Sequence, residues 1–216
     1  MIRILIVDDH PIVRKGLRQI VSDEQDMAVA ETGDAREALG MASANPFDVV
    51  VLDINLPGMS GIEALSQFRA LHPRIQVLIL SAHPETEFAI RALRAGAAGY
   101  LNKDLAPEEL IGAIRRIASG RKYVSAAVAE ILADAVGRDE EQPPHETLSD
   151  REYEVLLSIA AGRTVSEIAA EMSLSVKTIS TYRTRILEKM QLRNNAELMK
   201  YALSAGLGAR DSQDKH

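Results

Sequence analysis

The sequence predicts two domains of different class: a doubly wound α/β domain with a five-stranded parallel sheet, then an all-α domain of four short helices. Three observations predict this. Short β-branched apolar runs alternate with helical patterns through residues 1–120. An acidic stretch with two prolines then interrupts the apolar pattern. Beyond it, two capping-box sequences open amphipathic helices, and a three-residue turn follows the second of them.

Five apolar runs are the candidate strands of the first domain. They span 4–7, 27–31, 49–54, 77–80 and 98–101, and the second and fifth are the weaker ones. The other three are continuous and β-branched, which is typical of parallel strands buried on both faces. Stretches of helical spacing lie between them, for example Leu110, Ile111, Ile114 and Ile117. Strands that alternate with helices indicate a flavodoxin-like sheet, whose ligand site lies outside the carboxyl ends of the strands.

The composition changes after residue 120. Residues 124–136 have the spacing of another helix, and residues 137–146 combine acids with Pro143 and Pro144 and almost no apolar residue, which is a linker composition. We therefore expect an α/β domain over 1–120, a helix and acidic linker over 121–147, an all-α domain over 148–208 and a disordered tail over 209–216.

Composition also limits the function classes. With 46% hydrophobic and 26% charged residues, the 216-residue chain is typical of a folded protein. It has no cysteine, and no stretch approaches the ~18 apolar residues of a membrane span or the pattern of a signal peptide. We therefore expect a cytoplasmic protein without a membrane partner. A net charge of −6 excludes a generally basic nucleic-acid binder, so a basic face must be local. The local bases are Lys177, Arg183, Arg185, Lys189, Arg193 and Lys200.

The second domain has the pattern of a helix-turn-helix. Ser149 with Glu152, and Thr164 with Glu167, form capping-box patterns, and Gly162 ends the helix between them. Residues 173–175 turn the chain into a longer helix over 176–190, and a last helix spans about 195–204. Four short helices with a three-residue turn between the second and third are what this DNA-binding motif requires.

Polar side chains gather where the candidate strands of the first domain end. Asp8 and Asp9 follow the first strand, Asp53 and Ser81 end the third and fourth, and Lys103 follows the fifth. Three carboxylates at one edge repel one another and favour a hard cation with oxygen ligands, which points to Mg²⁺. Such an edge would suit metal-assisted phosphoryl transfer to a carboxylate. Taken alone, an Asp-Asp pair after a strand is equally well explained as solvated acids.

Four ordered motifs resemble the receiver domain of response regulators over residues 1–120. They are the run ILIVDDH from Ile4, the run VVLDINLPGMSG from Val50, Leu80-Ser81-Ala82, and the run GYLNK from Gly99. The resemblance implies that the first domain is switched by phosphorylation of an aspartate at the carboxyl edge of its sheet.

The resemblance gives each residue at this edge a role. It implies that Asp53 accepts a phosphoryl group, that Lys103 pairs with the phosphoryl oxygens and that Ser81 bonds to the new group. Tyr100 would swing inward as Ser81 moves, which would alter one face of the domain. The family more often has threonine at the Ser81 position, but the hydroxyl is retained. The implied Mg²⁺ ligands are Asp9, Asp53 and the carbonyl of Asn55, with Asp8 acting through water.

Several of these residues also have simpler explanations. Tyr100 is also explained as a half-buried strand residue, and Gly58 and Gly61 as glycines that a loop requires. His10 beside two acids would suit a transition-metal site, but in this family it is the residue that starts a helix. His83 would tune how fast the phosphoryl group is hydrolysed.

The helix over 176–190 has an apolar and a polar face. Ile179, Tyr182, Ile186 and Met190 recur at helical spacing and should face the core. On the polar face, hydroxyls can approach base edges and cations can reach phosphates, although a solvated face would explain a single amphipathic helix as well. The residues of the polar face are Lys177, Ser180, Thr181, Thr184 and Arg185.

Residues 146–207 closely resemble the LuxR-type helix-turn-helix. The resemblance rests on the runs LSDRE from Leu148, EIA from Glu167, LSVKTI from Leu174 and EKM from Glu188. A receiver followed by this domain is the NarL/FixJ class, which implies a transcription regulator and not an enzyme. The last helix resembles a dimerising helix, although its apolar residues would also suit a core. The positions near DNA in the family are Lys177, Thr178, Ser180, Thr181, Thr184 and Arg185.

The resemblance also implies the partners. They are a sensor histidine kinase that phosphorylates Asp53, double-stranded promoter DNA, a second copy of the phosphorylated chain, and RNA polymerase. Two other functions compete. A phosphatase with an aspartyl-phosphate intermediate conflicts with Asp53-Ile54-Asn55, which lacks the second acid of haloacid-dehalogenase-like enzymes. A protein that only relays phosphate conflicts with the DNA-binding pattern.

Overall fold

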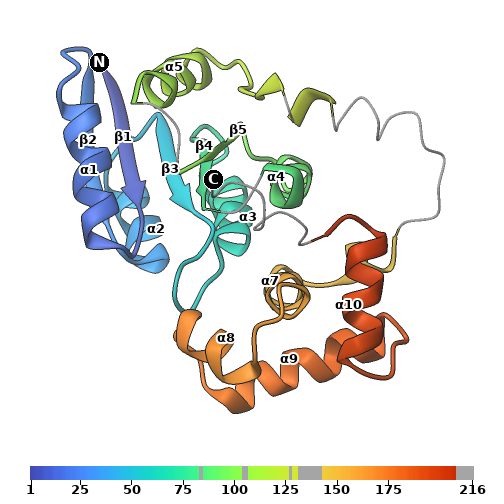
Figure 1. The fold of residues 1–216 in the computed structure, drawn as a ribbon. Helices are drawn as coiled ribbons and strands as arrows, with labels where there is room; N and C mark the ends of the chain where they lie inside the picture. Colours follow the sequence, from blue (N-terminus) through green and yellow to red (C-terminus); the bar gives the residue numbers. More distant parts are fainter. Residues whose placement is uncertain (83–84, 104–106, 127, 131–142, 208–216) are drawn as a thin grey trace, which may run out of the picture. The chain divides into compact units, whose positions relative to one another are not determined.

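The computed structural model describes residues 1–82, 85–103, 107–126, 128–130 and 143–207. The chain divides into two compact units, Met1–Arg138 and Asp139–His216 (Figure 1). The first unit contains the sheet and the second is helical in its described part. None of the described helices is long and apolar enough to cross a membrane.

The five predicted strands are confirmed and form one parallel sheet. They are β1 (Ile2–Val7), β2 (Met27–Thr32), β3 (Val49–Asp53), β4 (Gln76–Ser81) and β5 (Gly99–Asn102). Their order in the sheet is β2-β1-β3-β4-β5, which is the doubly wound order of flavodoxin-like folds. β1 starts two residues before its apolar run, because the Ile2 amide donates to Asp26 O at 2.8 Å and Ile2 pairs with Met27. Backbone pairing therefore extends past the hydrophobic signal.

In the described part of the first unit five helices flank this sheet, and side chains cap the starts of two of them. The Asp34 side chain accepts from the amides of Arg36 and Glu37 at the start of α2, and Ser60 caps α3 by accepting from Glu63 N at 3.1 Å. The helices are α1 (Pro11–Ser22), α2 (Ala35–Ala44), α3 (Gly61–Leu71), α4 (Glu85–Arg94) and α5 (Pro107–Ala118).

The core lies on both faces of the sheet because the strands are apolar throughout. On the face covered by α1 and α5, buried strand residues such as Ile4, Val51 and Leu80 pack with Ile114 and Ile117 of α5. Side chains alternate along each strand, so the remaining buried strand residues point to the opposite face, where α2 and α3 pack against each other. This arrangement brings the carboxyl ends of β1, β3, β4 and β5 to one edge of the sheet.

The second unit contains the predicted helices with both capping boxes. The Glu152 side chain accepts from Ser149 N at 2.8 Å, and the Glu167 side chain accepts from Thr164 N at 2.7 Å. The chain turns with Ser173 at φ 52, as the three-residue turn requires. The elements are η1 (Pro144–Thr147), α7 (Asp150–Ala160), α8 (Val165–Glu171), α9 (Val176–Lys189) and α10 (Asn195–Ser204).

The segment expected to join the domains is described only at its two ends. Before it, the Tyr123 amide donates to Ala98 O at 2.9 Å, which ties the residues after α5 to the start of β5. After it, η1 places His145 Nδ1 2.7 Å from the Tyr201 hydroxyl of α10, where the sequence indicated linker. Most of the expected helix over 124–136, residues 137–142 of the linker and the tail over 209–216 lie outside the described residues.

We expect Glu152→Ala to destabilise the second unit by about 1 to 3 kcal/mol, because it removes a buried carboxylate that accepts one charged and one backbone hydrogen bond. Glu152 is 2% exposed and accepts from Lys189 Nζ at 2.6 Å as well as from Ser149 N. Burial raises the pKa of Glu152, but Lys189 and Ser149 outweigh it and hold the pKa below its ordinary value. The carboxylate therefore stabilises the fold above pH ~4.3, and this contribution is lost as the pH falls through the lower folded pKa.

The matched control is Glu167→Ala, which removes the same capping box from an exposed position. Chemical denaturation at neutral pH and near pH 4 should show a larger loss for the Glu152 variant, and a difference between wild type and that variant that shrinks in acid. Equal losses for the two variants would contradict the assigned role of the contact between Glu152 and Lys189.

Candidate functional site

Two buried carboxylates share one lysine at the carboxyl edge of the sheet. Asp8 and Asp53 are 1% and 2% exposed, and Lys103 Nζ lies 2.7 Å from an oxygen of each. The predicted convergence of these three residues is therefore present. A buried carboxylate pair would repel without a cation between them, so Lys103 is the group that makes this pocket stable.

The backbone fixes these side chains from three strands. Asp8 follows β1, Asp53 ends β3, and Lys103 follows β5, where its amide donates to Ser81 O of β4 at 2.8 Å. Asp53 Oδ1 also accepts from the Asn55 amide at 3.2 Å. Both carboxylate oxygens of Asp53 are thus held, one by the lysine and one by the loop that follows its own strand.

The pKa values of Asp53 and Lys103 are shifted by their surroundings. Burial raises the pKa of Asp53 above its ordinary value, and the negative charge of Asp8 adds to this, while Lys103 opposes it. Burial alone would lower the pKa of Lys103, but Asp53 and Asp8 outweigh it, so this pKa is raised. Lys103 therefore stays charged, and it is the main group that keeps Asp53 ionised.

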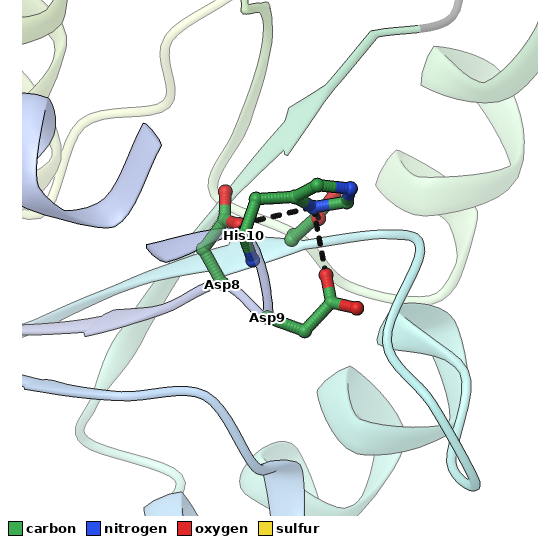
Figure 2. Close-up of side chains that lie close together, drawn as sticks. Asp8, Asp9 and His10 are labelled. Carbon is green, nitrogen blue, oxygen red and sulfur yellow. Dashed lines mark hydrogen bonds and ion pairs between the residues drawn. The ribbon is translucent and has the colours of Figure 1, made fainter. Parts of the chain in front are cut away.

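His10 is part of this pocket, although the sequence analysis favoured a helix start over a metal site for this residue. It is the residue before α1, and its ring lies over the acids (Figure 2). His10 Nδ1 lies 2.8 Å from Asp9 Oδ1, 3.4 Å from Asp8 Oδ1 and 3.9 Å from Asp53 Oδ2. The neighbouring acids in the sequence were the available signal, but which way the ring turns depends on the loop.

The donor set of the pocket fits a hard cation. Ligand atoms of Asp8, Asp9, His10 and Asp53 all lie within 4.8 Å of one another. Asp9 Oδ1 is buried and accepts no hydrogen bond from the residues that the structure describes; its close neighbour is the His10 ring. Carboxylate oxygens in this number are what Mg²⁺ prefers, so an acidic cluster able to hold a metal is present.

The remaining expected residues of this edge have different surroundings. Ser81 is buried at the end of β4, and Asn55 lies in the loop after β3. Tyr100 is 1% exposed, so its side chain is deeper than the half-buried strand residue that the sequence allowed. His83 lies outside the described residues.

The polar face of α9 presents the residues expected near DNA. Lys177, Ser180, Thr181, Thr184 and Arg185 are exposed, and Thr178 is partly exposed with its amide bound to the Ser175 cap at 3.1 Å. The opposite face is in the core, with Ile179 and Ile186 fully buried and Met190 6% exposed. Tyr182, expected with them, is only partly buried.

The four bases of α9 divide into two groups. Lys189 binds buried Glu152, and Arg183 Nε donates to Asn195 Oδ1 at 2.5 Å, so both are engaged within the unit. Lys177 and Arg185 form no ion pair with any residue in the described part of the chain. These two are therefore the cations of α9 that are available to a phosphate.

The fold and the pocket define a phosphoacceptor domain joined to a helix-turn-helix domain, and the comparisons agree with this class. Residues 4–115 match the response regulator receiver domain, and residues 146–202 match the LuxR family of bacterial regulatory proteins. The chain belongs to the two-component response regulators with a LuxR-type DNA-binding domain, and it is a transcription regulator controlled by phosphorylation.

Relatives cover nearly the whole chain. It is 35% identical over 209 residues to the response regulator UvrY of Escherichia coli, with 96% of both chains covered. It is also 35% identical to the response regulator GacA of Pseudomonas aeruginosa, covering 96% of this chain and 98% of that one.

Two solved structures agree with the family. A LuxR-family response regulator from Aurantimonas is 39% identical with TM-score 0.59, covering 63% of this chain and 98% of that one. The RcsB response regulator in complex with DNA is 26% identical with TM-score 0.59, covering 94% and 98%. The family consists of transcription factors, so the phosphatase and the DNA-independent relay are set aside.

Proposed function

We propose that Asp53 accepts the phosphoryl group from a sensor histidine kinase, with Lys103 and Ser81 as the groups that assist. The observation that carries this proposal is the Asp53 carboxylate, buried at a strand end and held by Lys103 Nζ at 2.7 Å. Asp8 is equally buried and lies equally close to Lys103, so the choice of Asp53 rests on the resemblance of the run VVLDINLPGMSG to the receiver motif.

The step is an exchange of one bond. An oxygen of Asp53 attacks the phosphorus of a phosphohistidine, an O–P bond forms, the P–N bond breaks, and the leaving imidazole takes a proton from water. Lys103 lies at the attacking carboxylate and balances the negative charge that arrives with the phosphoryl group. Ser81, at the end of the neighbouring strand, would donate its hydroxyl to a phosphoryl oxygen.

Asp9, Asp53 and the carbonyl of Asn55 would hold Mg²⁺, with Asp8 acting through water. When bound, Mg²⁺ supplies the positive charge that three carboxylates and a phosphoryl group together require. The buried Asp9 oxygen that accepts no hydrogen bond from described residues supports this assignment.

The domain changes state when Ser81 follows the new group and Tyr100 adjusts beside it. Ser81 and Tyr100 lie on the adjacent strands β4 and β5, where Tyr100 pairs with Ile79, two residues before Ser81. A local change of charge thereby biases a packed element that has two arrangements. Its effect is to promote dimeric binding to DNA.

The DNA-contacting residues of α9 would be Lys177, Thr178, Ser180, Thr181, Thr184 and Arg185. A dimer related by twofold symmetry would place two α9 helices on half-sites about one turn of DNA apart, and the RcsB relative was solved bound to DNA. Promoter DNA implies a cytoplasmic setting, with RNA polymerase as a further partner. The domain boundaries we propose remain 1–120, 121–147, 148–208 and 209–216.

The proposal is tested by locating the phosphoryl group. The protein is incubated with Mg²⁺ and acetyl phosphate and then reduced with borohydride, which converts an aspartyl phosphate to homoserine. Peptide mass spectrometry should find homoserine at position 53. Homoserine at position 8 or 9 instead would overturn the assignment of Asp53.

Lys177→Ala and Arg185→Ala are each expected to weaken DNA binding roughly tenfold, since a bond to a charged group contributes about 1.5 kcal/mol or more. Each should also reduce the slope of log affinity against log salt by about 1, because one phosphate contact fewer releases fewer counterions. Arg74→Ala, an exposed arginine of the first unit, is the control and should change neither quantity. Unchanged salt slopes in both α9 variants would count against this face.

A further inference from the structure

Two threonines on the polar face of α9 have already used their hydroxyl protons. Thr181 Oγ1 donates to Lys177 O at 2.9 Å, and Thr184 Oγ1 donates to Ser180 O at 3.0 Å. Both residues are exposed. A bond of this kind turns the hydroxyl back toward the preceding turn of its own helix. What remains for a ligand is the methyl group and the lone pairs of a hydroxyl that no longer donates.

The two threonines form one small patch on the surface of the helix. Residues three apart are neighbours on a helix surface, so Thr181 and Thr184 lie side by side. The unpaired cations of Lys177 and Arg185 lie within one turn of this patch, at its two ends. Ser180 differs from both threonines, because its hydroxyl forms no hydrogen bond with the residues that the structure describes. Ser180 is therefore free to donate to a base, whereas each threonine would first have to give up its bond to the helix backbone.

The groups that bases present in the major groove determine what such a patch can recognise. Guanine N7 and O6, adenine N7 and thymine O4 are acceptors and require a donor, but the proton of each threonine is already bound to a helix carbonyl. Thymine is the base that offers a methyl group there, and contact with a threonine methyl is one of the recurring ways to read it. An adenine or cytosine amino group could still donate to the hydroxyl oxygen, which is the alternative that an experiment must separate.

We propose that Thr181 and Thr184 read thymine through methyl contacts, so that each operator half-site has thymine at the one or two base pairs that this patch contacts. The proposal rests on α9 being the DNA-contacting face and specifies the chemistry that this face recognises. It makes the two threonines specificity-determining residues and leaves affinity for the DNA backbone to Lys177 and Arg185.

The test removes one methyl group at a time from either partner. A binding site is first selected from random DNA by the phosphorylated full-length protein, and its thymines are replaced singly by deoxyuridine, which lacks only the 5-methyl group. Wild type should lose about fourfold in affinity at one or two positions per half-site, equivalent to the ~0.8 kcal/mol of one buried methyl group.

Variants of the protein, combined with the deoxyuridine sites, complete a double-mutant cycle. Thr181→Ser and Thr184→Ser keep the hydroxyl and lose the methyl, so they should bind the selected site about fourfold less tightly and no longer respond to deoxyuridine at the position each reads. Thr181→Val and Thr184→Val keep a methyl group and should retain both the affinity and the deoxyuridine effect. Circular dichroism confirms that each variant is folded.

The outcomes separate this proposal from the assignment of α9. Weak binding by the valine variants with normal binding by the serine variants would show that the hydroxyls are read, and would overturn the methyl contact. Normal binding by the serine variants, while Lys177→Ala and Arg185→Ala still bind weakly, would overturn the methyl contact alone. Normal binding by all of these variants would overturn the DNA-contacting face itself.

Discussion

Lys103→Met is expected to slow phosphorylation by acetyl phosphate on the order of 100-fold, the scale of losing one preorganised charge at a reacting group. Lys103 contacts the Asp53 carboxylate and lowers its pKa against the effects of burial and Asp8. Without the lysine, the pKa of Asp53 rises further, so a larger share of the nucleophile is protonated. The acid limb of the rate profile should therefore move to higher pH in the variant.

Two further variants make this result specific. Lys103→Arg keeps a positive charge and should retain more activity and stability than Lys103→Met, which leaves Asp8 and Asp53 buried together without a cation. Lys15→Met removes an exposed lysine of α1 and should leave the rate with a small phosphodonor unchanged. A wild-type rate with an unshifted acid limb in Lys103→Met would exclude the assigned role of the lysine.

Gly61→Ala is expected to destabilise the first unit by at least about 2 kcal/mol and to lower the rate of phosphorylation at the same time. A Cβ atom at Gly61 would lie 2.3 Å from Asp53 O and 2.5 Å from Ile54 Cα, both of them backbone atoms. The Gly61 amide also donates to Ile54 O at 2.8 Å, which closes the loop after β3. Any side chain would push against the peptide that positions the Asp53 carboxylate.

The matched control is Gly112→Ala in α5, where an added Cβ meets nothing within 4 Å. Alanine in a helix is favoured over glycine by about 1 kcal/mol, so this variant should be more stable than wild type. Thermal unfolding and the acetyl phosphate reaction measure both quantities. Normal stability and normal phosphorylation in Gly61→Ala would contradict the close approach of the loop to Asp53.

The acidic edge could be predicted from the sequence because each of its residues is adjacent to a buried strand. Once the runs ending in Asp8 and Asp53 are recognised as parallel strands, their carboxyl ends must meet at one edge of the sheet. The capping boxes at Ser149 and Thr164 were equally visible, because each is complete within four residues.

Contacts that depend on side-chain direction were not predictable in the same way. The His10 ring joins the acids because of the loop geometry before α1, and Lys189 is drawn from the basic face into an interaction with Glu152, 37 residues away. The hydroxyls of Thr181 and Thr184 likewise turn back to the helix, although their polar character suggested donors toward DNA. Periodicity identifies the face of a helix but not the partner of each group on it.

The most direct test measures phosphorylation of the pocket and affinity for DNA in one experiment. Wild type and Asp53→Asn are treated with Mg²⁺ and acetyl phosphate, and the intact mass and the affinity for a selected DNA site are measured on the same samples. We expect one added phosphoryl group and at least roughly tenfold tighter binding, or about 1.4 kcal/mol, in wild type alone. A phosphorylated wild type with unchanged affinity, or an Asp53→Asn variant that gains affinity on treatment, would contradict control of DNA binding through Asp53.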